Sequence, residues 1–141
     1  MTTEQNKQMV RNTIEAINRN DLDAATRDFD SNYVYRSPAT GDMRGAKGFK
    51  EVITMYKRGF PDLHVEIETM MADGDKVTVL ARNTGTHKGE FMGIAPTGKK
   101  ATVRLSATYT CRNGKIVDEL DIFDSFDLLK QLDAVPAELT G

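Results

Sequence analysis

The spacing of apolar residues divides the chain into a helical first part and a strand-rich second part. Apolar side chains recur every three or four residues from Met9 to Ile17 and again over residues 46–60, which predicts two amphipathic helices. A short helix over 22–29 follows Asp21, a residue type that caps helix N-termini, and residues 31–36 are predicted to form a short strand. Pro61 has no backbone N–H and prevents the helix over 46–60 from continuing.

After Pro61 the apolar period changes from 3.6 residues to 2 and stays there, which predicts strands. Four strands and a closing amphipathic helix are expected at residues 64–71, 76–86, 100–111, 115–124 and 125–132. Residues 37–45 and 90–98 contain Pro and Gly and are interpreted as loops. Helices followed by antiparallel strands predict an α+β fold. We expect a curved, mixed, mostly antiparallel sheet wrapped around the N-terminal helices, with a cone-shaped cavity that suits a small apolar ligand.

Length and composition restrict the functional classes. A chain of 141 residues is expected to form a single domain, residues 1–141, and 39% hydrophobic residues are enough for a core. The formal net charge of −2 disfavours a nucleic-acid partner that depends on bulk positive charge. No apolar run is long enough to span a membrane and the N-terminus has no apolar signal region, so we expect a cytoplasmic protein.

The last predicted hairpin holds the residues most suited to chemistry. A three-residue loop ending at Gly114 would pair Ala107 with Glu119 and Leu105 with Asp121. A two-residue turn at 113–114 would shift this pairing by one, so the register stays open at this stage. In the preferred register one face is apolar except for a tyrosine hydroxyl and two carboxylates: Val103, Leu105, Ala107, Tyr109, Cys111, Val117, Glu119, Asp121 and Phe123.

A carboxylate on the apolar face of a sheet is costly unless it is hydrogen-bonded, protonated or functional. Burial raises the pKa of such a group toward neutrality, where it can serve as a general acid or base. The sequence therefore predicts Asp121 as a catalytic residue, with Tyr109 as a hydrogen-bond donor and Glu119 beside them. The alternative is that Asp121 and Glu119 lie on a solvated rim and serve only solubility.

Two stretches of the sequence resemble a known family. The run GTHKGEFMGI at 85–94, followed by PTGK at 96–99, is similar to the central signature of SnoaL-like polyketide cyclases. The segments FPDL at 60–63 and NGKIV at 113–117 support the resemblance, which extends from the first helix to Leu132. These cyclases belong to the nuclear-transport-factor-2-like superfamily, with ketosteroid isomerase and limonene epoxide hydrolase. The resemblance implies an α+β cone and a homodimer formed through the sheets.

For the cyclases, the resemblance also implies an intramolecular aldol condensation that closes a ring of a polyketide ester without a metal or cofactor. The acid/base aspartate of the family matches Asp121. The histidine that assists it falls on Ala107, whose methyl group cannot donate a hydrogen bond or relay a proton. Tyr109 is the expected substitute for this histidine. Tyr33 and Tyr35 are further candidate donors, and the sequence favours neither of them.

The remaining candidates concern ligand contacts. Beside the catalytic pair, the residues expected to contact the ligand are Glu119, Phe123, Leu105, Ala107, Tyr35, Phe91 and Met92. His87 is a further candidate base, although a histidine in such a loop more often fixes the backbone. No metal site is expected, because His64 and His87 are far apart and Cys111 has no companion cysteine. An epoxide hydrolase relay would need Arg104, which faces away in the preferred register.

Two main functions follow from these residues. The first is a cofactor-independent acid/base enzyme for a small apolar carbonyl compound, with Asp121 as its base. The second is a non-catalytic protein that binds a hydrophobic metabolite in the same cavity, which Ala107 favours. A purely dimeric scaffold is a third hypothesis and would require the cavity to be filled by Phe91, Tyr109 or Phe123.

Overall fold

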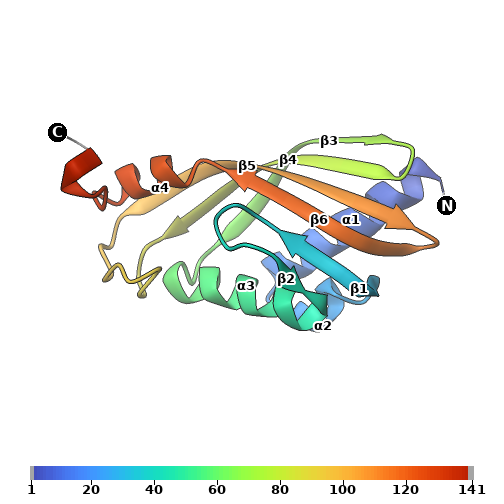
Figure 1. Ribbon diagram of the computed structural model, residues 1–141, viewed down its shortest axis with the longest axis horizontal. Coiled ribbons are helices and arrows are strands. Elements are labelled where there is room, and N and C mark those ends of the chain that lie inside the picture. The colour runs from blue at the N-terminus through green and yellow to red at the C-terminus, as the bar shows by residue number, and fades with distance from the viewer. Residues whose placement is uncertain (1, 140–141) are drawn as a thin grey trace.

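The computed structural model describes residues 2–139, and in this range the chain forms a six-stranded sheet with helices packed against it (Figure 1). The helices are α1 (Thr3–Asn18), α2 (Leu22–Ala25), α3 (Gly45–Gly59) and α4 (Ser125–Gln131), with a final 3₁₀ turn at Ala137–Leu139. The strands are β1 (Phe29–Arg36), β2 (Met43–Arg44), β3 (His64–Asp73), β4 (Lys76–Thr86), β5 (Lys100–Arg112) and β6 (Lys115–Phe123).

The strand order across the sheet is β2-β1-β6-β5-β4-β3. Strands β1 and β6 run parallel to each other, and every other neighbouring pair is antiparallel. The predicted α+β fold with a curved, mixed, mostly antiparallel sheet is therefore confirmed. The sheet is not closed, because β2 and β3 lie at opposite edges and do not pair.

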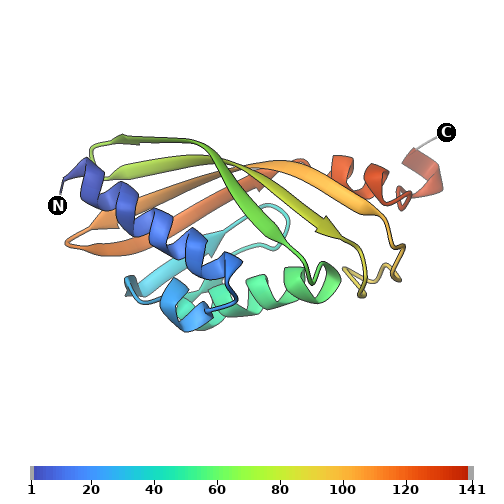
Figure 2. The ribbon, with the colours of Figure 1, turned by 180° about the vertical axis from the view of Figure 1, so that it is seen from behind.

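The helices cover the inner face of this curved sheet. Figure 2 shows the strands arching over α1 and α3, with α4 extending beyond one end of the sheet. Helix α1 packs on β3 and α3 packs on β1, and both present apolar stripes to the sheet. Thr2 begins α1 with a capping box, in which its side chain accepts a hydrogen bond from the backbone N–H of Gln5.

Two of the predicted boundaries are wrong. Phe29 begins β1 instead of ending a helix, because it pairs with Ile116 of β6 and its ring stacks on Tyr33 with centroids 4.0 Å apart. The predicted loop over 37–45 also contains β2, whose two residues pair with β1. The other helices and strands end within two residues of the predicted positions.

The register of the β5–β6 hairpin also differs from the predicted one. Asn113 and Gly114 both have positive φ angles, of 52° and 74°, and form a two-residue turn. A β-bulge where the strands leave this turn adds a second shift of one residue. Ala107 therefore lies opposite Asp121, while Tyr109 lies opposite Glu119. Because the two shifts add up to two residues, the side chains keep their predicted face.

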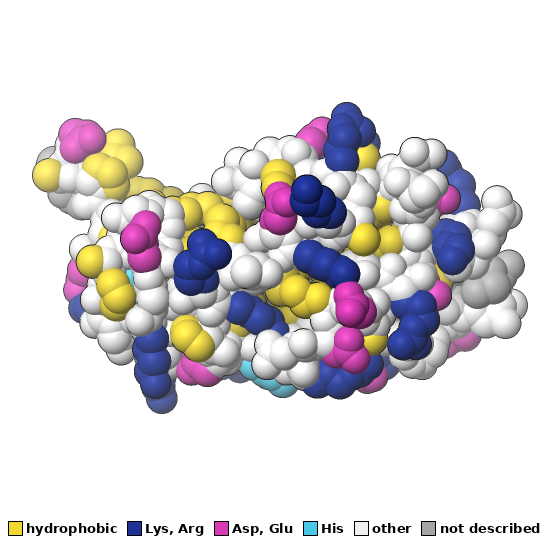
Figure 3. Space-filling model, turned by 90° about the horizontal axis from the view of Figure 1, so that it is seen from below, with side chains coloured by type: hydrophobic (Ala, Val, Ile, Leu, Met, Phe, Trp, Pro, Cys, Tyr) yellow, Lys and Arg dark blue, Asp and Glu magenta, His cyan; other side chains and the backbone are white. Residues whose placement is uncertain are grey.

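Charged side chains of both signs are mixed on the face seen in Figure 3. Lys and Arg side chains are interspersed there with Asp and Glu over the whole face. No helix within residues 2–139 has the length and apolar character needed to cross a bilayer.

Candidate functional site

A partly open cavity of about 100 Å³ lies between the inner face of the sheet and the helices. Its wall is mostly apolar, with residues from α1, α3, α4 and five strands. Seven polar side chains also line it: Tyr35, Tyr56, Asn83, Thr84, Tyr109, Glu119 and Asp121. An apolar cavity with a few converging polar groups is typical of a site that binds a small molecule.

Two carboxyl groups of β6 lie together at one end of this cavity. Glu119 is 3% exposed and Asp121 is 7% exposed, and both side chains point inward because they are two residues apart on one strand. The Tyr33 hydroxyl donates a hydrogen bond to Glu119 Oε1 over 2.9 Å. The predicted position of Asp121 on the apolar face agrees with this geometry, whereas a solvated rim does not.

Burial raises the pKa of both carboxyl groups, and the charge of Glu119 raises that of Asp121 further. For Glu119, burial raises the pKa, and hydrogen bonds from Asp121, Tyr33 and Tyr109 act against it. For Asp121, burial and the nearby Glu119 charge raise the pKa well above its usual range, and a hydrogen bond from Tyr35 acts against them. Two close buried carboxyl groups resist simultaneous ionisation, which favours a proton shared within the pair.

One oxygen of this pair is free to meet a ligand. Asp121 Oδ1 is buried and has no hydrogen-bond partner within residues 2–139. A buried polar atom without a partner costs about 1–3 kcal/mol, so its presence needs an explanation. Since Asp121 lines the cavity, a ligand in the cavity can supply the missing partner.

The predicted contact residues fall into two groups. Tyr35, Leu105, Ala107 and Phe123 line the cavity together with the carboxyl pair. Phe91 is buried, but it does not line the cavity and packs behind Tyr56, with ring centroids 5.5 Å apart.

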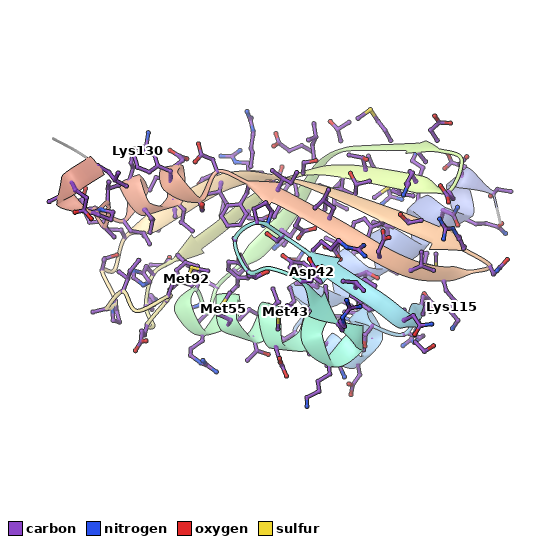
Figure 4. All side chains as sticks on the ribbon, in the orientation of Figure 1. Asp42, Met43, Met55, Met92, Lys115 and Lys130 are labelled. Atoms are coloured by element: carbon purple, nitrogen blue, oxygen red, sulfur yellow. The ribbon has the colours of Figure 1, made fainter. Side chains whose placement is uncertain are left out.

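Met92, the last predicted contact residue, lies outside the cavity. It is 51% exposed, on the loop beside the end of α3, as Figure 4 shows. Phe91 and Met92 are neighbours in the sequence signature, but in the fold the Phe91 side chain is buried and the Met92 side chain is exposed.

His87 is buried in the loop and does not line the cavity. Its Nδ1 accepts a hydrogen bond from the Thr97 backbone N–H over 3.2 Å, which assigns its proton to Nε2. Its ring stacks on Phe60, with centroids 5.4 Å apart. Through these contacts His87 holds the loop around Thr97 next to Phe60.

The rest of the signature also packs against the end of α3. The Thr86 backbone N–H and hydroxyl both donate to the Asp62 carboxylate, each over 2.7 Å. These bonds hold the pKa of Asp62 below its usual range. Gly89 has no room for a side chain, because a Cβ would lie 2.0 Å from the backbone carbonyl oxygen of Arg58.

Other reactive side chains lie away from the carboxyl pair. Arg104 is on the outer face of the sheet, where its Nε lies 3.1 Å from Glu68 Oε1. Burial raises the pKa of Cys111 to about 11, which keeps its thiol protonated. Within residues 2–139, no three His, Cys, Asp or Glu side chains gather closely enough to hold a metal ion.

Three polar residues of the cavity were not predicted from the sequence: Tyr56, Asn83 and Thr84. Tyr56 lies on the buried stripe of α3, where its spacing resembles that of an ordinary core residue. Asn83 lies on β4 in one inward-facing row with Val77, Val79 and Ala81. A polar side chain in this apolar row is the feature from which the sequence could have predicted a cavity residue.

A family model described as SnoaL-like polyketide cyclase matches residues 7–132. Among solved structures, AclR, a hydroxylase candidate from Streptomyces galilaeus, is 27% identical, with a TM-score of 0.84 and coverage of 96% of this chain and 100% of its own. IdmH, a candidate polyketide cyclase from Streptomyces antibioticus, is 28% identical, with a TM-score of 0.81 and coverage of 92% and 99%.

A third structure shares the fold at lower identity. It is a SnoaL-like polyketide cyclase candidate from Jannaschia sp. CCS1, 22% identical, with a TM-score of 0.87 and coverage of 95% of each chain. No curated protein matches the sequence significantly.

Proposed function

Since the chain belongs to the SnoaL-like polyketide cyclase family, we propose that it is a cofactor-independent enzyme that removes a proton beside a carbonyl group. The observation that carries this proposal is Asp121 Oδ1, a buried carboxyl oxygen without a partner in an apolar cavity. A base in such a site is stronger than in water, since burial disfavours its ionised form. That property suits the removal of a weakly acidic carbon-bound proton.

The shared proton of the carboxyl pair gives a balanced reaction step. Glu119 accepts hydrogen bonds from Tyr33 and Tyr109 and so carries the negative charge, while Asp121 holds the proton between the two groups. Asp121 Oδ1 takes the substrate proton as its own proton passes to Glu119. The electron pair of the broken C–H bond moves to the carbonyl oxygen and forms an enolate.

The same groups can complete an aldol reaction. The enolate carbon attacks a second carbonyl carbon of the substrate, and a new C–C bond forms. The oxygen of that carbonyl receives a proton from Asp121, while the proton on Glu119 returns to Asp121. The pair then holds one proton again and is ready for another turnover.

The size of the cavity favours a small substrate. Ligand pockets usually enclose about 300–1,000 Å³, whereas this cavity has a volume of about 100 Å³. We therefore favour a small apolar ketone or keto ester over a large multi-ring polyketide. The relative IdmH, a candidate polyketide cyclase, supports the aldol form of this chemistry.

A second candidate function is the binding of a hydrophobic metabolite without chemical change. Ala107 favours it, because this methyl group lies directly opposite Asp121 at the position that matches the assisting histidine of the cyclases. Binding alone would use the apolar wall and leave the carboxyl pair as a polar anchor for the ligand.

Deuterium exchange separates the two functions without knowledge of the natural substrate. The protein is mixed with small ketones in D₂O, with 2-tetralone as reference compound, and loss of the carbon-bound proton is followed by NMR. We expect exchange above the buffer rate, and Asp121→Asn to reduce this excess by about 10²–10⁴-fold, the usual contribution of a general base.

Asp118→Asn is the matched control. Asp118 is next to the pair on β6, but it lies on the other face of the strand, where its carboxylate is 3.3 Å from Arg36 Nη1. Its variant should exchange protons at the rate of the unmodified protein. Tight binding of a ketone with equal exchange in Asp121→Asn and unmodified protein would contradict catalysis and favour the binding function.

A further inference from the structure

We propose that Tyr56 is a second catalytic residue, whose hydroxyl donates a hydrogen bond to the substrate carbonyl oxygen. This inference rests on the proposed function and names the group that would stabilise the enolate. The base alone does not complete the reaction, because negative charge must accumulate on an oxygen in an apolar cavity. Such charge is costly there unless a positioned donor meets it.

Several polar atoms around the cavity have no hydrogen-bond partner in the described part of the chain. Three buried side-chain atoms that belong to cavity-lining residues have no hydrogen-bond partner within residues 2–139: Tyr56 Oη, Asn83 Oδ1 and Asp121 Oδ1. Of these three, the Tyr56 hydroxyl is a hydrogen-bond donor, whereas the other two are oxygens that accept. Enolate formation needs two groups: a base that accepts the carbon-bound proton and a donor that hydrogen-bonds to the carbonyl oxygen.

The four tyrosines of the chain differ in how they interact with the carboxyl pair. Three of them interact with the carboxyl pair: the Tyr33 hydroxyl donates to Glu119 over 2.9 Å, while Tyr109 lowers the pKa of Glu119 and Tyr35 lowers that of Asp121. Tyr56 feels the charge of Asp121 but makes no hydrogen bond with it. Its proton is therefore available to a ligand, whereas the other three are used within the site.

Tyr56 is protonated and its ring is held in place. Burial, together with the nearby Asp121 charge, raises the pKa of Tyr56 to about 12, so its hydroxyl keeps its proton at neutral pH. The ring is fixed between Phe91 and Phe123, with centroids 5.5 Å and 6.3 Å away. A fixed donor requires little reorganisation when charge develops on the substrate.

Tyr56 also compensates for a missing group on the opposite wall. Ala107 faces Asp121 from β5 and offers no donor, whereas Tyr56 enters the same cavity from α3. The donor and the base would then act from opposite sides of the substrate. This arrangement favours compounds whose carbonyl oxygen can reach Tyr56 on α3 while their acidic carbon lies beside Asp121 on β6.

A binding experiment tests Tyr56 without any turnover. The probe is 4-nitrophenolate, an apolar ring with a delocalised oxyanion, titrated by absorbance into Asp121→Asn, whose neutral amide stands in for the protonated Asp121 that faces the enolate. We expect Asp121→Asn/Tyr56→Phe to bind it at least tenfold more weakly. Equal affinity in the two proteins, or no binding to Asp121→Asn, would overturn the role of Tyr56.

Kinetics supply a second readout that a structural role would not give. In the exchange assay with 2-tetralone, Tyr56→Phe should lower the plateau rate by about 10²–10³-fold without moving the pH profile. Tyr33→Phe removes a donor to Glu119 and should instead shift the profile to higher pH. A shifted profile in Tyr56→Phe would show that Tyr56 acts through the carboxyl pair and would contradict the proposal.

The two experiments also separate this inference from the proposed function. If Asp121→Asn abolishes exchange while Tyr56→Phe affects neither exchange nor phenolate affinity, the base is correct and the donor is wrong. If phenolate affinity depends on Tyr56 but no ketone exchanges protons, the donor is correct and the proposed function is wrong. A thermal melt of each variant confirms that the compared proteins are folded.

Discussion

Asp62 and Asp121 are the same residue type in opposite environments. Asp62 is exposed, accepts two hydrogen bonds from Thr86 and has a lowered pKa. Asp121 is buried, keeps one oxygen without a partner and has a raised pKa. Asp62 is hydrogen-bonded and stabilises the fold, whereas Asp121 keeps an oxygen that is available for chemistry.

The contrast extends to the regions around these two residues. The signature segment over residues 85–99 holds the end of α3 through Thr86, His87 and Gly89. The carboxyl pair lies instead on β6, outside that segment. The segment that carries the resemblance to the family therefore stabilises the fold, and the proposed reaction depends on residues elsewhere. The following predictions test this division.

The largest expected effect comes from Gly89→Ala. Its new Cβ would lie 2.0 Å from the Arg58 carbonyl oxygen, so the backbone at the end of α3 must move. We expect a loss of about 3 kcal/mol or more in the free energy of unfolding, measured by urea denaturation. Lys88→Ala, at an exposed neighbour, should change it by less than about 0.5 kcal/mol.

His87→Ala should follow in size. It removes a fully buried ring from Phe60 and leaves the Thr97 backbone N–H without its acceptor, which predicts a loss of about 2–3 kcal/mol in unfolding free energy. Exchange activity per folded molecule should stay unchanged. A specific loss of activity in a stable variant would instead place His87 in the reaction and remove the contrast between the two regions.

Asp121→Asn should increase stability at alkaline pH. The folded protein holds the proton of the carboxyl pair more tightly than the unfolded chain, so wild-type stability falls as the pH rises above the unfolded pKa of about 4. The amide removes this dependence and should be about 1–2 kcal/mol more stable at pH 8. Urea denaturation at pH 5 and pH 8 should show the gain shrinking at the lower pH.

Asp62→Asn should give the smallest effect, with the opposite dependence on pH. The lowered pKa of Asp62 means that its contribution is present above the unfolded pKa and is lost as the pH falls through the folded value. We expect a loss of about 1 kcal/mol at pH 7, the typical size for such a hydrogen bond, and a smaller loss near pH 3. A loss that grows toward acidic pH would contradict this assignment.

The sequence predicts most of the fold because its apolar periods are clear. It misplaces Phe29, whose role depends on pairing with Ile116, a residue far along the chain. It also places Asp121 on the correct face with the wrong partner. The pairing depends on the turn at Asn113–Gly114 and on the bulge, and a local pattern does not reveal how two such shifts combine.

The candidate site is less predictable than the fold. Asp121 and Glu119 could be found because carboxyl groups are unusual on an apolar face. Tyr56 could not, because a tyrosine on the buried stripe of a helix has the same pattern whether its hydroxyl is bonded or free. Only the arrangement of all four tyrosines around the carboxyl pair reveals which one is left without a partner.

The narrow cavity has a consequence for the speed of binding. A volume of about 100 Å³ is tight for a bicyclic ketone such as 2-tetralone, so we expect side chains of the wall to shift when such a ligand enters. Such opening motions often occur in microseconds to milliseconds and can be slower than diffusion. The observed binding rate should therefore level off as the ligand concentration rises, at a ceiling set by how often the wall opens.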